Sequence, residues 1–166
     1  MDRITIRPAT GQDVMQISEI ITEDWRLAYR GIIDDGFLNS LSVEDRYRRE
    51  LPRYDKYIVA AENDKVLGLA WLELSAEDGA DCEIIALYVR YGLRNSGVGR
   101  ALMANAVGQF KNAGKKKMII WCLRDNAEAR GFYEKMGGRV FKDGAHCWGD
   151  REYPMISYIY DLDEIL

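Results

Sequence analysis

The sequence predicts an α/β protein with a mixed, mostly antiparallel central sheet and helices on both sides. Two patterns carry this prediction. Apolar, β-branched runs of strand length recur along the chain, and segments with apolar residues at three- and four-residue spacing stand between them. With 166 residues, of which 48% are hydrophobic, the chain is long enough to bury a full core. No repeat, low-complexity tract or linker divides it, so we expect one domain over residues 1–166.

The first elements are a strand and two helices. Residues 3–7 alternate as a strand, and residues 10–13 have the form of a capping box. This box opens an amphipathic helix that carries Trp25 and Tyr29 at its end. A second, strongly charged helix is predicted from Ser42 to the neighbourhood of Pro52.

The remaining elements alternate between strands and helices. Residues 57–62 and 66–74 predict a hairpin around Asn63 and Asp64, and residues 82–89 predict the next antiparallel strand. The later segments predict, in order, a helix over about 97–113, a strand over 118–123, a helix over 126–136 ended by Gly137 and Gly138, and strands near 139–142 and 153–162. Residues 143–150, which include His146, are predicted to form a loop between the last two strands.

Composition excludes several classes of function. A net charge of −4 gives no support to nucleic-acid binding and suits a cationic substrate better. No apolar run approaches the roughly 18 residues of a membrane span, and the N-terminus lacks the apolar core of a signal peptide, so we expect a cytoplasmic protein without membrane contact. Three cysteines without a CxxC pair indicate neither a disulfide framework nor a zinc site, and the single histidine, His146, disfavours histidine-based catalysis or metal binding.

The junction between residues 82–89 and the following helix has the features of a diphosphate site. The first backbone N–H groups of a helix have no intrahelical partner and carry partial positive charge. Gly97 and Gly99 leave these groups accessible, and Arg94 and Arg100 add formal charge. The loop is not a P-loop, because no Lys and Ser/Thr follow the second glycine, and a dinucleotide fingerprint is incomplete because Leu102 stands where the third small residue belongs.

Two motifs in this order give the chain a resemblance to a known family. The first is Arg-x-x-Gly-x-Gly from Arg94 to Gly99, directly after a strand that ends Leu-Tyr-Val. The second is a strand followed by Asn-x-x-Ala-x-x-Phe-Tyr from Asn126 to Tyr133, with a glycine stop. Together they resemble the GNAT superfamily of acetyl-CoA-dependent N-acetyltransferases, and the resemblance runs from Ile4 to about Leu162.

The resemblance implies where acetyl-CoA binds. In this family two neighbouring parallel strands splay apart at the acyl-CoA site, and the pantetheine arm lies in the gap. The backbone of Leu87 and Val89 would bind this arm, with Val89 N–H also placed to polarise the thioester carbonyl. For Asn126 both a helix N-cap and a contact with the arm are expected. The pyrophosphate would be held, chiefly by backbone N–H groups, by Arg94, Asn95, Ser96, Gly97, Val98, Gly99 and Arg100; a solvated helix charge is the alternative for Arg100.

The resemblance also implies a catalytic pair. Tyr133 would protonate the departing thiolate as general acid, although core packing beside Phe132 is its alternative role. Glu83 stands where many relatives carry a catalytic glutamate, and it would deprotonate the amine directly or through a water; a structural ion pair is equally open. By simple alternation Glu83 shares a sheet face with Ile85 and Leu87, which favours a polar cleft there.

Of the proposed reaction, the sequence says least about the identity of the acceptor. Trp25 and Tyr29 belong to a Trp-x-x-x-Tyr-x-Gly-Ile-Ile segment found in one branch of the superfamily, and they either contact the acceptor or pack the first helix. Asp34 and Asp35 either attract an amine or form an ordinary turn, and the loop with His146 is a candidate lid or dimer contact. The resemblance therefore implies acetyl transfer to a primary amine of a small molecule or peptide within a ternary complex, without a metal, in a monomer or homodimer. The alternative is a non-catalytic acyl-CoA-binding regulatory or structural protein.

Overall fold

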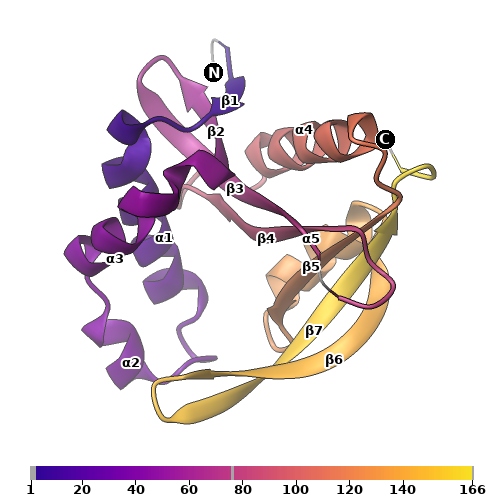
Figure 1. Cartoon of the computed structure of the whole chain (residues 1–166). Coiled ribbons are helices and arrows are strands. Elements are labelled where there is room, and N and C mark those ends of the chain that lie inside the picture. Colours follow the sequence, from indigo (N-terminus) through magenta and orange to yellow (C-terminus); the bar gives the residue numbers. More distant parts are fainter. Residues whose placement is uncertain (1–2, 76, 166) are drawn as a thin grey trace.

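The computed structural model describes residues 3–75 and 77–165. Its centre is a seven-stranded sheet in the order β1-β2-β3-β4-β5-β7-β6, in which β4 and β5 are parallel and the other neighbours are antiparallel (Figure 1). The predicted mixed, mostly antiparallel sheet is confirmed. The strands are β1 (Thr5–Pro8), β2 (Tyr57–Glu62), β3 (Lys65–Leu74), β4 (Cys82–Val89), β5 (Lys117–Leu123), β6 (Arg139–Trp148) and β7 (Arg151–Asp161).

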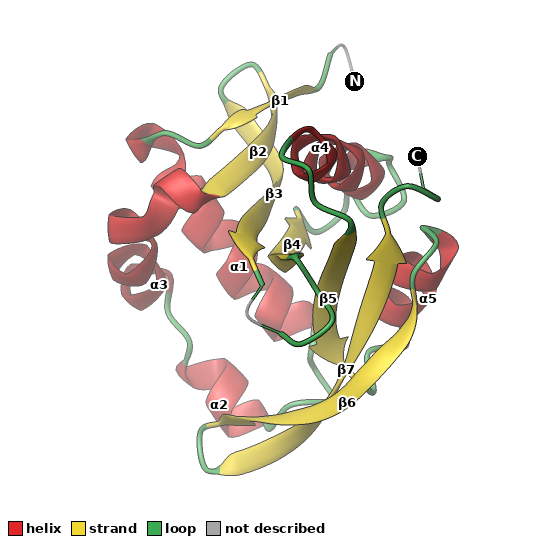
Figure 2. Cartoon of the chain, turned by 45° about the vertical axis from the view of Figure 1, so that its right-hand side comes forward, coloured by secondary structure: helices red, strands yellow, loops and turns green. Residues whose placement is uncertain are grey.

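Helices cover both faces of the sheet, and each face has its own core (Figure 2). On one face α4 and α5 pack over buried side chains such as Leu102, Tyr133 and Tyr158. On the other, α1 packs with α2 and α3 nearby, over a core that includes Ile17 and Leu69. The helices are α1 (Val14–Ala28), α2 (Asp35–Ser40), α3 (Val43–Glu50), α4 (Val98–Asn112) and α5 (Ala127–Lys135), with short 3-10 segments η1 (Gly11–Asp13) and η2 (Leu51–Lys56).

The parallel pairing of β4 with β5 is short. It joins Cys82 to Met118 and Ile84 to Ile120, and no further pair between these strands follows within the described residues. β4 nevertheless continues to Val89 beside β3, and β5 continues to Leu123 beside β7. The sheet is therefore open between the carboxyl-terminal halves of β4 and β5.

A β-bulge in β4 overturns the predicted alternation of its side chains. Trp71 pairs with Ala86 and Leu72 with Ile84, so Ile85 is the extra residue. The side-chain period of a strand is two, and one inserted residue reverses the faces of all that follow. Leu87 consequently packs into the α4 core together with Ile84. The prediction that Glu83 shares a face with Leu87 was wrong for this reason.

The predicted loop over residues 143–150 was also wrong. Residues 143–148 extend β6, which pairs with β7 until the hairpin turns at Gly149, whose φ is +65°. The sequence signal was weak because β6 is an edge strand with mostly exposed, polar or small side chains. His146 accordingly lies on a strand, exposed, opposite Tyr153.

The described part of the chain offers no reactive thiol pair or metal cluster. Cys82 and Cys122 are buried in strands, and burial raises the pKa of their thiols to about 12 and about 11. Cys147 is free and exposed. Over residues 3–75 and 77–165, no helix is long and apolar enough to span a membrane, and no group of at least three His, Cys, Asp or Glu side chains is arranged for a metal ion.

Candidate active site

A cavity of about 710 Å³ runs through the opening between β4 and β5. From the α4 face it is lined by side chains that include Leu87, Val89 and Tyr133. From the α1 face it is lined by side chains that include Trp25 and Trp71. The cavity thus connects the two faces of the sheet.

The turn before α4 forms one mouth of this cavity. Asn95 and Gly97 adopt left-handed conformations, with φ of +64° and +93°, and Gly97 is the N-cap of α4. Its cap has no side-chain hydrogen bond, so the first-turn N–H groups remain available for an anion. Gly97 and Gly99 both line the cavity, and a methyl group at Gly99 would lie 3.4 Å from Phe132. This mouth fits the pyrophosphate of a coenzyme A ester.

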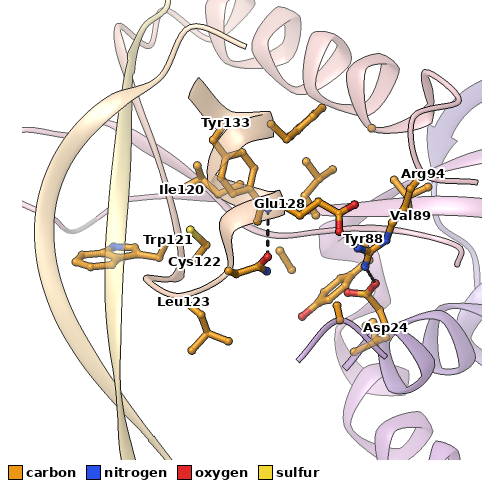
Figure 3. A pocket seen from close by; sticks show the side chains of 18 of the residues that line it. Asp24, Tyr88, Val89, Arg94, Ile120, Trp121, Cys122, Leu123, Glu128 and Tyr133 are labelled. Carbon is orange, nitrogen blue, oxygen red and sulfur yellow. Dashed lines mark hydrogen bonds and ion pairs between the residues drawn. The ribbon is translucent and has the colours of Figure 1, made fainter. Parts of the chain in front are cut away.

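Arg94, which was predicted to bind phosphate, forms ion pairs with two carboxylates of the protein. Its guanidinium donates to Asp24 on α1 and, at 2.7 Å, to Glu128 on α5 (Figure 3). Burial raises the pKa of the Asp24 carboxyl, and the Arg94 hydrogen bond opposes that rise. Arg94 therefore ties the turn to helices on both faces of the sheet at the cavity wall. For the Arg94 side chain to bind a phosphate group, it must exchange these ion pairs for contacts with the phosphate.

Tyr133 lies where the cavity crosses the sheet, opposite Tyr88 (Figure 3). Its ring packs on Phe132 and Tyr158, with centroids 5.7 and 6.0 Å apart. No described residue hydrogen-bonds its hydroxyl group, and burial raises the pKa of that phenol well above 10. Asn126 lines the same region, and its side chain accepts a hydrogen bond of 3.2 Å from Ala129 N–H, which confirms the predicted N-cap.

Glu83 does not line the cavity. It pairs in register with Glu73 of β3 and Ile119 of β5, which places its side chain on the α1 face. Trp71 and Trp121 lie on the same face, two residues along β3 and β5 from these partners. Burial, with a smaller effect of Glu77, raises the pKa of Glu83 to about 7. Within the described chain Glu83 has no hydrogen-bond or ion-pair partner, so the structural ion pair considered for it is absent there.

Aromatic side chains form the wall of the cavity on the α1 face. Trp25 contacts Tyr29 and Trp148 edge-on, with ring centroids 4.8 and 5.3 Å apart, and its indole N–H donates to the Tyr88 hydroxyl at 2.9 Å. Both predicted aromatic residues therefore pack the helix and line the cavity. Asp34, by contrast, caps α2 through a 3.1 Å bond from Phe37 N–H and does not line it.

A buried charge cluster closes the cavity beside η2. Glu50, fully buried, accepts hydrogen bonds of 3.1 and 2.7 Å from Arg53 and one of 2.5 Å from the Tyr57 hydroxyl. Arg46 approaches Glu50 at 3.5 Å, and Arg53 stacks over Trp71, 4.6 Å from its ring centroid. Although burial alone favours the neutral acid, these partners keep the pKa of Glu50 below its usual value.

Most of the predicted site residues meet at the cavity, and three do not. Glu83 lies outside it, Val98 is buried in the α4 core, and the Ser96 hydroxyl donates to the Leu93 carbonyl. The lining residues that were predicted are Trp25, Tyr29, Leu87, Val89, Arg94, Asn95, Gly97, Gly99, Arg100, Asn126 and Tyr133. Sequence reasoning missed Asp24, Arg46, Arg53, Tyr57, Trp71, Trp121, Glu128, Trp148 and Met155, which no local motif marks.

A sheet opened between two parallel strands, with an uncapped helix start at one mouth, fits an acyl-CoA-dependent acyltransferase. The model of the Acetyltransferase (GNAT) family matches residues 15–138, and the chain belongs to this family of acetyl-CoA-dependent enzymes.

Relatives and a solved structure agree with this membership. The uncharacterized N-acetyltransferase YuaI of Bacillus subtilis is 28% identical, and the match covers 89% of this chain and 88% of YuaI. The probable N-acetyltransferase Rv2775 of Mycobacterium tuberculosis is 30% identical, and the match covers 83% of each chain. The PaiA N-acetyltransferase of Thermoplasma acidophilum, solved in complex with coenzyme A, has the same fold. It has a TM-score of 0.76, with 21% identity over 95% of this chain and 99% of that one.

Proposed function

We propose that this protein transfers an acetyl group from acetyl-CoA to a primary amine of a small molecule or peptide, directly within a ternary complex. The observation that carries the proposal is the cavity through the sheet. It joins an anion-binding helix start on the α4 side to an aromatic chamber on the α1 side. Such a passage brings a thioester and an amine together without a covalent enzyme intermediate.

The residues of the turn and of β4 fit acetyl-CoA, which supplies the activated acetyl group. The N–H groups at Gly97, Val98 and Gly99 would bind its pyrophosphate, with Arg100 beside them. The backbone of Leu87 and Val89 faces the opening and has no partner on β5 in the described structure. These backbone groups would hydrogen-bond the pantetheine amides, and Val89 N–H would polarise the thioester carbonyl.

Tyr133 is the proposed general acid. Tyr133 lines the cavity, and its raised pKa keeps its hydroxyl group protonated at neutral pH. A protonated phenol donates to the sulfur as the carbon–sulfur bond breaks, so the leaving group departs as a neutral thiol.

Glu83 is the proposed base, acting through water. An ammonium group with a pKa near 10 must lose a proton before it attacks the carbonyl carbon. Glu83 lies on the acceptor side of the sheet, without a described partner, and its pKa of about 7 suits a proton acceptor near neutral pH. Because it does not line the cavity, the proton passes to it through an intervening water.

The test is release of free thiol from acetyl-CoA by the purified protein across polyamines, amino acids, aminoglycosides and short peptides. Release above the rate without acceptor, with the acetylated product identified by mass spectrometry, supports the transferase. Binding of acetyl-CoA by calorimetry with no release across the panel contradicts the proposal and favours the non-catalytic binder.

A further inference from the structure

The end of the cavity beside α3 and η2 carries positive charge that the neighbouring residues do not balance. Arg46 and Arg53 both line it, whereas Glu50, the carboxylate that binds them, is fully buried behind them. We infer that this end binds the carboxylate of an amino-acid-like acceptor, an inference that rests on the proposed acetyl transfer. The acceptor would present its amine toward the thioester and its carboxylate toward Arg46.

The two arginines are held differently. Arg53 gives Glu50 a bidentate pair of hydrogen bonds and stacks on Trp71, so its position is fixed. Arg46 has a single long contact of 3.5 Å with Glu50, and no other described residue pairs with it. One carboxylate therefore faces two guanidinium groups, and the loosely held Arg46 has donors left over.

Arg46 is also in the right surroundings to bind an anion strongly. Only 15% of its side chain is exposed, and although burial raises the pKa of the nearby Tyr88 phenol, the positive charge of Arg46 opposes that rise. A guanidinium at low solvent exposure favours a planar, bidentate partner such as a carboxylate. Because Arg46 is on α3, on the α1 face, it is separated by the sheet from the helix start that binds phosphates.

The same cavity disfavours a second cationic group on the acceptor. Among the described residues that line it, the carboxylates are Asp24 and Glu128, and Arg94 binds both. A polyamine would therefore meet the unbalanced positive charge of Arg46 and Arg53 at one end and neutralised carboxylates at the wall. The aromatic side chains between them, Trp25, Tyr57, Trp71 and Trp148, provide an apolar surface for a side chain.

The experiment compares acceptors that differ only in the carboxylate. Initial rates are measured for the common L-amino acids and, for each that is acetylated, for its amide and for the decarboxylated amine, with spermidine as the cationic reference. We expect kcat/KM to be roughly 10- to 100-fold higher for the amino acid, the usual effect of a charged hydrogen bond. Arg46→Gln should remove this preference, chiefly by raising KM for the amino acid, with a much smaller effect on kcat/KM for the decarboxylated amine.

Two variants control the interpretation. Arg49→Gln removes an exposed positive charge from the same helix and should change neither rate. Arg46→Lys keeps the charge without the bidentate geometry and should retain part of the preference. Thermal melts of each variant show whether the fold is kept.

Four outcomes separate the inference from the proposed function. Equal kcat/KM for amino acids and their decarboxylated amines, or equal losses for both in Arg46→Gln, overturns the carboxylate site but leaves acetyl transfer standing. A preference for spermidine does the same. No transfer to any acceptor, with acetyl-CoA bound, overturns both.

Discussion

Replacement of Tyr133 by Phe removes one oxygen atom at the point where the cavity crosses the sheet. The phenyl ring keeps its contacts with Phe132 and Tyr158, at centroid distances of 5.7 and 6.0 Å. The hydroxyl group has no hydrogen-bond partner among the described residues, so its loss leaves no polar group unpaired there. The substitution therefore separates chemistry from packing.

The expected magnitudes differ widely between activity and stability. Loss of a general acid costs about 100- to 10,000-fold in rate, or about 3–5 kcal/mol of transition-state stabilisation. The free energy of unfolding should change by less than about 0.5 kcal/mol, which corresponds to roughly 2 °C in melting temperature for a chain of this size. The affinity for acetyl-CoA should stay within about twofold, because backbone groups provide its main contacts.

The assay is thiol release at saturating acetyl-CoA and acceptor, beside calorimetric binding and a thermal melt of the same preparation. Because burial raises the pKa of Tyr133 well above 10, the wild-type rate should show no alkaline loss from this group in the usual assay range. A decrease of less than about threefold in Tyr133→Phe, with unchanged binding, would refute the assignment of general acid.

Three further substitutions test other parts of the site. Glu83→Gln should abolish the rise of kcat/KM that the wild type shows as the pH passes about 7. Because the pKa of Glu83 is higher in the folded protein than in the unfolded chain, the wild type loses stability as the pH rises from the unfolded to the folded pKa. The variant should therefore melt at a higher temperature than the wild type at pH 8, and an unchanged melting temperature would contradict this. Asp24→Asn should release Arg94 for the phosphates and tighten coenzyme A binding several-fold by calorimetry, whereas weaker binding would contradict the proposed exchange. Glu50→Gln should lower the free energy of unfolding by about 2–3 kcal/mol in urea titrations, because Arg53 loses its buried partner; a loss below about 0.5 kcal/mol would show that the cluster is not structural.

The sequence predicts those parts of the site that depend on local backbone geometry. Gly97 and the motif around it mark the start of α4, and Asn126 marks the start of α5, because caps and left-handed turns restrict residue type strongly. The strand limits of β4 were correct for the same reason, since its apolar run ends at a turn.

The sequence does not predict features that arise from tertiary contacts. The extra residue at Ile85 changes the face of Leu87, but nothing in the local pattern distinguishes a bulged strand from a regular one. Arg46 and Arg53 occur in a charged helix and the segment after it, where surface positions are the ordinary expectation. Only the tertiary structure, in which both arginines pair with the buried Glu50, places them in the wall of the cavity.

The opening between β4 and β5 gives this sheet an edge in its interior. Beyond Ile84 the described structure shows no strand pairing from β4 toward β5, so backbone groups there are free to accept an added strand. At an outer edge such groups invite pairing with another protein chain, but here α1 packs on β4 from one face and α4 from the other. The fold thus keeps a template for β-addition inside the sheet, covered by a helix on each face, where a slender, amide-bearing ligand can take the place of a strand.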